Sequence, residues 1–271
     1  MAEAGFGERY GPWALIAGAS EGTGAAFARQ LAAAGLNLIL IARREGPLDA
    51  LAGELHAAHP DTQVITATID LAKKDAAERM AQVAEGREVG LLILNAGADP
   101  NGATFLDNAV ANWIDLTNRN VMTVLKACHH FAGLMRPRGR GGMILVNSGA
   151  CYMGLPGCSV YGATKAYDLV LGESLWAELA PHGIDVLNLV MGQTDTPAYR
   201  ELMARKGIPF PSGTADPEAV AALGLARLPH GPTTNWGEAD DAAGMTFSSA
   251  AQRRERIRMI AAHAMQYGAK E

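Results

Sequence analysis

The sequence predicts one α/β domain, spanning residues 1–271, built on a doubly wound parallel sheet. Short apolar runs alternate with longer helical patterns along most of the chain. The runs are apolar on both faces, as is typical of parallel strands that helices cover on both sides. A glycine-rich turn also joins the first apolar run to the first helical pattern. The length of 271 residues and a hydrophobic content of 49% allow a sizeable core.

The order of elements follows from these runs and from the residues that punctuate them. Predicted strands occupy residues 13–18, 37–42, 63–70, 90–95, 142–148 and 183–190. Predicted helices lie between them, over 22–35, 47–59, 74–85, 107–135 and 159–181. Gly35 suits the end of the first helix, because glycine readily adopts the left-handed conformation that ends helices. Pro47 suits a first helical turn, where its missing N–H costs no hydrogen bond.

The pattern loosens after Gly192, where prolines become frequent. Short helices are predicted near 197–206 and 216–228, with a weakly marked seventh strand near 233–236. We expect the segment of about 194–230 to form a lid over a ligand site. An amphipathic pattern over 248–266 predicts a C-terminal helix.

Charge and composition exclude several classes of protein. A formal net charge of −5 and a pI near 5.8 argue against nucleic-acid binding. The acidic start lacks the apolar stretch of a signal peptide, and no run approaches the length of a membrane span. The three cysteines have neither disulfide-framework nor zinc-site spacing, so we expect a cytoplasmic protein without a metal.

The glycine-rich turn GASEGTG (18–24) lies between a predicted strand and a predicted helix. Backbone N–H groups and the helix dipole converge at such a point and favour a phosphate. Gly18 permits the tight turn, Gly22 lets a diphosphate approach the backbone, and Gly24 allows helix and strand to pack closely. The turn therefore indicates a dinucleotide site, although a plain strand-to-helix turn remains the alternative.

The end of the second predicted strand bears on which dinucleotide binds. An acidic residue there would bind the ribose 2′-hydroxyl of NAD(H), but Ala42 occupies the position. Arg43 and Arg44 follow, and a guanidinium matches a 2′-phosphate bidentately. We therefore expect NADP(H) rather than NAD(H). The alternative is a pair of solvated surface charges, with Glu21 adding negative charge nearby.

Tyr161 and Lys165 are four residues apart in a predicted helix, so they share one face. A phenol ordinarily has a pKa of about 10, and a neighbouring ammonium favours its ionised form. Such a phenol could exchange a proton with a carbonyl or alcohol. Chance would also produce this pair, but Ser148 ends the fifth predicted strand, at the edge where ligands bind in such sheets.

Together these features resemble the short-chain dehydrogenase/reductase family, over residues of about 12–196. The resemblance rests on GASEGTG (18–24), NAG (95–97), Asn120, Ser148 placed thirteen residues before the tyrosine, and YGATK (161–165). It implies a Rossmann-like sheet of about seven strands, a nicotinamide cofactor, and hydride transfer between a carbonyl and an alcohol.

The resemblance also implies a role for each matching residue. Tyr161 is expected to be the acid/base, Lys165 to lower its pKa and hold the nicotinamide ribose, and Ser148 to steady the reacting oxygen. Asn120 is expected to hold a water that relays protons towards Lys165. The expected cofactor contacts are Gly18, Ser20, Gly22, Thr23, Gly24, Arg43, Arg44, Asp70, Leu71, Asn95, Ala96, Gly97, Tyr161, Lys165, Thr194 and Thr196.

The substrate side departs most from the family pattern, because Met191-Gly192 replaces the usual Pro-Gly turn. An apolar lining predicts a hydrophobic carbonyl compound, such as a steroid-like, aromatic or fatty molecule. The expected substrate contacts are Ser148, Met153, Leu155, Tyr161, Met191, Tyr199 and Leu202.

Two other functions are compatible with the same fold. A non-catalytic dinucleotide-sensing protein is one, but such proteins often lose the tyrosine or the lysine, and this chain keeps both. An epimerase or dehydratase of the family's extended branch is the other, although those chains are usually longer. The family resemblance implies a homodimer or homotetramer formed through the helices near 107–135 and 159–181.

Overall fold

One parallel sheet of seven strands organises the chain in the computed structural model, which describes residues 5–100 and 102–237. The strand order is β3-β2-β1-β4-β5-β6-β7. The strands are β1 (Trp13–Ala17), β2 (Asn37–Ala42), β3 (Val64–Thr68), β4 (Val89–Leu94), β5 (Gly141–Ser148), β6 (Ile184–Met191) and β7 (Thr233–Asn235). The predicted doubly wound, Rossmann-like fold is therefore confirmed, with its weak seventh strand.

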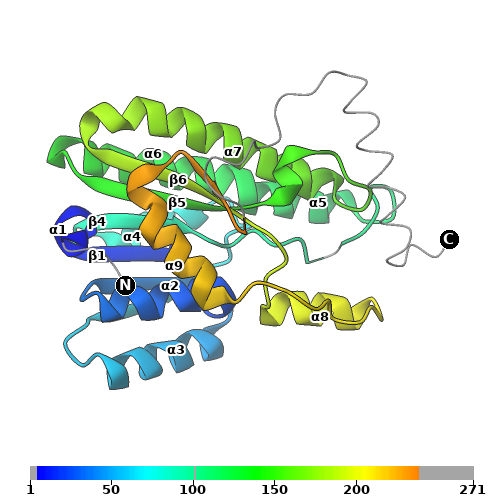
Figure 1. Ribbon diagram of the computed structural model, residues 1–271, viewed down its shortest axis with the longest axis horizontal. Helices are drawn as coiled ribbons and strands as arrows, with labels where there is room; N and C mark the ends of the chain where they lie inside the picture. The colour runs from blue at the N-terminus through cyan, green and yellow to red at the C-terminus, as the bar shows by residue number, and fades with distance from the viewer. Residues whose placement is uncertain (1–4, 101, 238–271) are drawn as a thin grey trace.

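Helices cover both faces of this sheet (Figure 1). Helices α2, α3 and α9 pack on one face, and α4, α6 and α7 pack on the other. The helices are α1 (Phe6–Tyr10), α2 (Gly22–Ala33), α3 (Glu45–Ala58), α4 (Ala76–Ala84), α5 (Val110–Thr117), α6 (Thr123–Met135), α7 (Ser159–Leu179), α8 (Pro197–Arg205) and α9 (Pro217–Arg227). No helix within the described ranges is long and apolar enough to cross a membrane.

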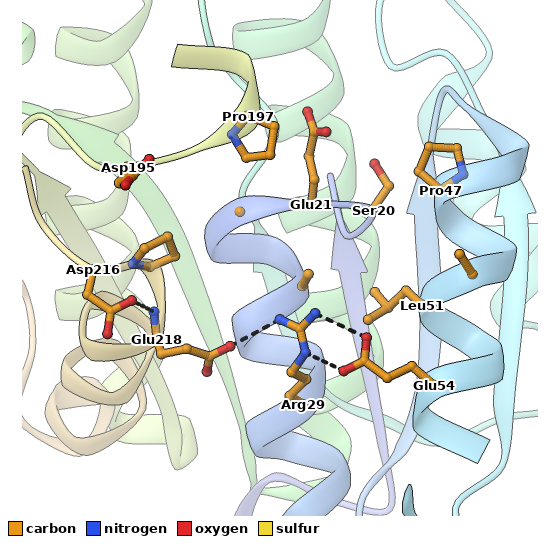
Figure 2. A pocket seen from close by; sticks show the side chains of 14 residues that line it. Ser20, Glu21, Arg29, Pro47, Leu51, Glu54, Asp195, Pro197, Asp216 and Glu218 are labelled. Carbon is orange, nitrogen blue, oxygen red and sulfur yellow. Dashed lines mark hydrogen bonds and ion pairs between the residues drawn. The ribbon is translucent and has the colours of Figure 1, made fainter. Parts of the chain in front are cut away.

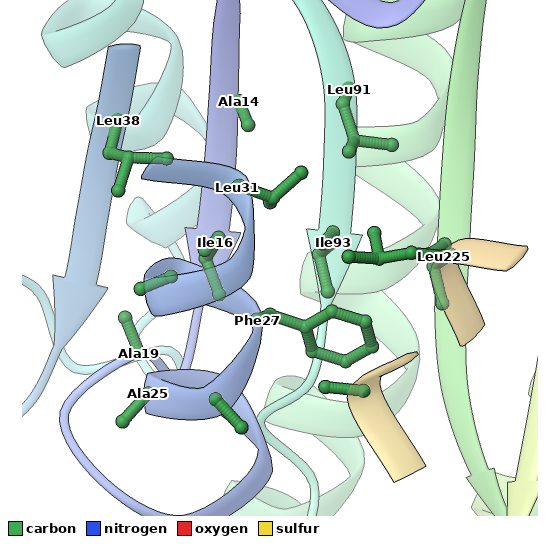
Figure 3. Packing of buried hydrophobic residues seen from close by; sticks show 14 of the residues in the cluster. Ala14, Ile16, Ala19, Ala25, Phe27, Leu31, Leu38, Leu91, Ile93 and Leu225 are labelled. Carbon is green, nitrogen blue, oxygen red and sulfur yellow. The ribbon is translucent and has the colours of Figure 1, made fainter. Parts of the chain in front are cut away.

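The sheet divides the hydrophobic core into two clusters, one on each face. Alternate residues of β1 point to opposite faces, so Ile16 packs beneath α2 while Leu15 packs beneath the helices of the other face. Figure 3 shows Phe27 of α2 lying between the strands and Leu225 of α9. Each such fully buried side chain contributes about 1.5–3 kcal/mol. The double-sided burial explains why the strands are apolar throughout.

Several differences from the sequence prediction have local causes. The helix α1 was not predicted, because five residues are too few for a periodic pattern. The predicted helix 107–135 is two helices, α5 and α6, joined by a π-helical turn, Asn118–Met122. Helix α9 packs in the core against α2, so only the residues before α9 remain candidates for the predicted lid. The predicted helix 248–266 lies outside the described residues.

The strand order reverses between β1 and β4, which are neighbours in the sheet. Their carboxyl ends open a crevice in doubly wound sheets, because the chain leaves the two strands in opposite directions. The glycine turn follows β1 and the segment 95–97 follows β4. The topology thus brings the two predicted cofactor segments to one point.

Candidate active site

The glycine turn is built so that backbone approaches backbone. Gly18 has a φ of +86°, and its N–H donates to the Ile41 carbonyl at 2.7 Å. A Cβ on Gly24 would lie 2.0 Å from the Gly18 carbonyl oxygen. Asn95 fastens the turn from β4, since its Nδ2 donates to that same oxygen at 2.8 Å. The predicted packing role of Gly24 therefore has a direct geometric basis.

The N-terminus of α2 opens from this turn without a side-chain cap. The N-cap residue, Glu21, makes no capping hydrogen bond, so the first N–H groups of the helix are left for another acceptor. Gly22 has a φ of +55°, and a Cβ there would lie 2.8 Å from Cγ2 of Thr196. An uncapped helix start within a glycine cradle fits a dinucleotide phosphate.

Thr196 also begins α8, because its Oγ1 accepts a hydrogen bond from the Tyr199 N–H at 3.2 Å. The buried Thr194 donates from Oγ1 to the Gly192 carbonyl at 3.2 Å. It pairs with Ala215 in an isolated parallel bridge. Thr196 is thus held against Gly22 of the glycine turn, although the two are far apart in sequence.

Arginines gather beyond β2, where the 2′-phosphate was predicted. Arg44 is paired with Glu21 at 2.5 Å, which neutralises the nearby acid. Arg43 has no ion-pair partner within the described ranges. The sequence analysis did not single out Arg119, which lies near Asp70 and Arg43. Desolvation lowers the pKa of its guanidinium.

Asp70 and Leu71 lie just after β3, not at its last position as the sequence suggested, because β3 ends at Thr68. The Asp70 Oδ1 accepts the Ala72 N–H at 3.1 Å, which shapes the turn. The Leu71 carbonyl accepts a hydrogen bond from Oγ1 of Thr123 at 2.8 Å, which ties the turn to α6. Hydrogen bonds therefore fix the backbone at these two predicted cofactor contacts.

Asn120 lies fully buried within the π-helical turn. Its Nδ2 donates to the Gly97 carbonyl at 3.1 Å and to Oγ1 of Thr164 at 3.0 Å. Its Oδ1 has no hydrogen-bond partner in the described part of the chain. Buried amide oxygens are usually satisfied, so this one fits a bound water or ligand group.

Lys165 is buried one helical turn after Tyr161. Its Nζ donates to the Val146 carbonyl at 2.9 Å and to Oδ2 of Asp168 at 3.1 Å. A Cβ on Gly97 would come within 2.7 Å of this Nζ. Glycine at that position therefore keeps the ammonium open to the segment that follows β4.

Tyr161 lies in the first turn of α7, and Ser148 is the last residue of β5. Both side chains are half-buried. The Ser148 Oγ accepts the Ala150 N–H at 3.3 Å. No hydrogen bond joins the two hydroxyls among the described residues. Gly162 lets the start of α7 approach the segment after Ser148, since a Cβ there would lie 3.2 Å from the Ala150 carbonyl.

Several of the predicted substrate contacts already pack against other parts of the chain. Met191 packs against the core, and its sulfur accepts a hydrogen bond from Oγ1 of Thr23 at 3.8 Å. The Tyr199 ring meets Phe210 edge-on, with centroids 5.4 Å apart. Leu202 faces the backbone near Gly102. The remaining apolar candidates, Met153 and Leu155, are half-buried.

A hollow of about 600 Å³ lies on the outer side of the glycine turn, between α2, α3 and α9 (Figure 2). Its one basic residue, Arg29, is held between two carboxylates, with ion pairs of 2.6 Å to Glu54 and 3.1 Å to Glu218. Acidic side chains make up much of the lining, but Ser20 and Gly22, two of the predicted cofactor contacts, also line this hollow, so it adjoins the predicted phosphate site. Its lining residues are Ser20, Glu21, Gly22, Ala25, Arg29, Pro47, Ala50, Leu51, Glu54, Asp195, Pro197, Asp216, Pro217 and Glu218.

No cluster of three or more metal-ligating side chains occurs among residues 5–100 and 102–237. The cysteines are free thiols. Burial raises the pKa of the Cys128 and Cys151 thiols to about 12 and also raises that of Cys158. None of the three is therefore an ionised nucleophile at neutral pH.

Comparison with known proteins identifies the family that the sequence motifs resemble. A model of the short chain dehydrogenase family matches residues 12–207. A 7beta-hydroxysteroid dehydrogenase from Clostridium sardiniense is 32% identical over 221 residues, covering 80% of this chain and 78% of that protein. A very-long-chain 3-oxoacyl-CoA reductase from Podospora anserina is 35% identical over 179 residues, covering 65% of this chain and 53% of that protein.

Solved structures agree with these sequence relatives. A structure from work on 7beta-hydroxysteroid dehydrogenase stereoselectivity superposes with a TM-score of 0.82 at 28% identity, covering 96% of this chain and 99% of the other. A short-chain dehydrogenase from Sphingobium yanoikuyae in complex with NADPH superposes with a TM-score of 0.75 at 26% identity, covering 96% of this chain and 98% of the other. The chain belongs to the short-chain dehydrogenase/reductase family and is an NAD(P)-dependent oxidoreductase.

Proposed function

We propose that this protein is an NADP(H)-dependent oxidoreductase that interconverts a carbonyl and a secondary alcohol of a hydrophobic small molecule. One observation carries the proposal. The ammonium of Lys165 and the amide of Asn120 converge on Gly97, beside the crevice between β1 and β4. Tyr161 precedes Lys165 by one helical turn, and Ser148 ends the neighbouring strand β5.

The chemistry divides among these side chains. The nicotinamide cofactor supplies or removes a hydride when it is bound. Tyr161 donates its phenolic proton to the substrate oxygen in reduction and accepts one in oxidation. The Lys165 ammonium stabilises negative charge on that phenol electrostatically. Ser148 holds the substrate oxygen by a hydrogen bond from its hydroxyl.

Asn120 is proposed to hold the water that relays protons towards Lys165. Its unpartnered Oδ1 lies in a buried cluster with Gly97 and Thr164, where a water would find a polar partner. The π-helical turn supports this role, because such turns are frequent at functional sites.

The preference for NADP(H) rests on Arg43. Ala42 ends β2 where an acid would bind an NAD(H) ribose. Arg44 is engaged with Glu21, which leaves Arg43 to meet a 2′-phosphate, and Arg119 adds positive charge nearby. Arginine is suited to such a contact, because its planar guanidinium matches a phosphate with two hydrogen bonds.

The substrate class is inferred from the predicted apolar contacts Met153 and Leu155, which follow Ser148 in the chain, and Leu202 of α8. The names of the relatives, which are a hydroxysteroid dehydrogenase and a very-long-chain 3-oxoacyl-CoA reductase, point in the same direction. We therefore propose a steroid-like, aromatic or fatty substrate, for a cytoplasmic enzyme.

A homodimer or homotetramer is proposed through the helices α5, α6 and α7. These helices expose large apolar side chains that a monomer would leave in water. Light scattering of the purified protein measures the mass in solution directly, and a monomer would contradict the proposal. The exposed residues are Val110, Ile114, Leu125, Leu134, Val170 and Trp176.

Tyr161→Phe tests the proposed mechanism. The variant keeps the ring and loses only the hydroxyl, so NADPH should still bind while carbonyl reduction falls by about 100- to 10,000-fold. Tyr167→Phe is the matched control, because it removes a phenol from the same helix outside the proposed site. Equal turnover by Tyr161→Phe and wild type would reject the mechanism.

A further inference from the structure

Asp168 follows Lys165 by three residues in α7 and belongs to no motif that we recognised in the sequence. Its side chain is only 3% exposed, and that of Lys165 is 5% exposed. Helical spacing brings the two onto one face, and the carboxylate Oδ2 lies 3.1 Å from Nζ. A carboxylate so deeply buried is rare unless it is paired.

The ammonium has three N–H donors, and the structure shows where two of them point. One donates to the Val146 carbonyl of β5 at 2.9 Å, and one donates to Asp168. Nζ also lies beside Gly97, at the crevice between β1 and β4. One N–H is therefore left, on the side of the site where the phenol and the cofactor ribose are proposed to lie.

Among residues 5–100 and 102–237, Lys165 is the one cation that acts on Asp168. The titratable groups that act on it or respond to it are Lys165 and Tyr167 of α7, Cys128 of α6, and more weakly Cys151. Oδ1 has no hydrogen-bond partner within the described residues. The carboxylate thus has one strong interaction, with the lysine of the proposed site.

We infer that Asp168 is a positioning residue that holds the Lys165 ammonium against β5 and supplies its counter-charge. The inference rests on the proposed function for its link to turnover. Without the carboxylate, the four-carbon chain of Lys165 has one anchor instead of two, so its third N–H is aimed less accurately at its partners. The site also gains one net positive charge.

Asp168→Asn tests the inference, with Glu173→Gln as the matched control. Glu173 lies on the same helix, is exposed, and accepts a hydrogen bond from Thr233. For Asp168→Asn we expect carbonyl turnover to fall by about 10- to 100-fold and NADPH, titrated by fluorescence without a carbonyl, to bind more weakly. The acid limb of the pH profile for alcohol oxidation should move to lower pH, because removing the carboxylate leaves the positive charge of the Lys165 ammonium uncompensated.

A purely structural role would lower the melting temperature and leave NADPH affinity and the acid limb unchanged in the folded variant, which would overturn the inference. A limb moved to higher pH would overturn it as well. If Asp168→Asn does not fold, Asp168→Glu shifts the carboxylate by one methylene, and wild-type NADPH affinity and profile would again contradict us. The binding titration needs no turnover, so it distinguishes failure of this inference from failure of the proposed function.

Discussion

Gly24→Ala is the substitution whose cost follows most directly from the structure. The added Cβ would lie 2.0 Å from the Gly18 carbonyl oxygen and 2.8 Å from Nδ2 of Asn95. The Gly18 backbone and the half-buried Asn95 amide cannot readily move aside, because a hydrogen bond of 2.8 Å joins them. Overpacking commonly costs 1–3 kcal/mol, and a clash with backbone belongs at the upper end, at about 3 kcal/mol.

Gly53→Ala is the control for this prediction. Gly53 lies exposed within α3, and a Cβ there would meet nothing within 4 Å. Alanine at a free helical position stabilises by about 0.5–1 kcal/mol. The two variants should therefore differ by about 4 kcal/mol in free energy of unfolding.

Urea titration followed by circular dichroism measures this difference, and fluorescence titration with NADPH measures its consequence. Gly24→Ala should bind NADPH weakly, because opening the turn moves the N-terminus of α2. Gly53→Ala should bind it as wild type does. Equal stability and equal NADPH affinity of the two alanine variants would refute the packing role of Gly24.

Three further predictions concern charge. Arg43→Ser should raise the KM for NADPH by about tenfold or more and leave that for NADH unchanged, because only NADPH carries the phosphate; steady-state kinetics with both cofactors decides. At pH 8 the buried Cys128 and Cys151 should resist iodoacetamide until urea exposes them, because each has a pKa of about 12, and mass spectrometry counts the adducts. Burial raises the pKa of the Asp168 carboxyl more than Lys165 lowers it, so the folded chain holds that proton more tightly than the unfolded chain. The stability of wild type minus that of Asp168→Asn should therefore be greatest in acid and decline as the pH rises from about 4.

A specific result would contradict each of these three predictions. An equal rise in KM for both cofactors would show that Arg43 does not read the phosphate. Rapid alkylation of Cys128 in the folded protein would contradict its burial. A stability difference that grows with pH would mean that the Asp168 carboxyl has a lowered pKa.

The strands could be predicted from the sequence because helices cover both faces of the sheet, which makes every position apolar. The π-helical turn at 118–122 could not be predicted in this way. One extra residue in a helical turn shifts the apolar periodicity too little to separate it from a continuous helix. The short β7 was only weakly marked, since three residues give little pattern.

The candidate site was predictable where its residues belong to a motif. Gly18, Asn95, Asn120 and Lys165 come together as the motif spacing implied, although their roles remain proposals. Asp168 and Arg119 were missed for a physical reason, since a charged residue on a helix usually faces water. Only the tertiary structure shows that the Asp168 carboxylate is buried and paired with Lys165.

The central claim is hydride transfer to a hydrophobic carbonyl with protonation by Tyr161. The direct measurement uses NADPH with both hydrogens of the reactive nicotinamide carbon replaced by deuterium. This cofactor is incubated with a panel of apolar ketones, and mass spectrometry analyses the alcohols formed. The account predicts alcohol that carries deuterium on the former carbonyl carbon with wild type, and almost none with Tyr161→Phe. Deuterated alcohol formed equally by both proteins, or none from any ketone while NADPH binds, would contradict it.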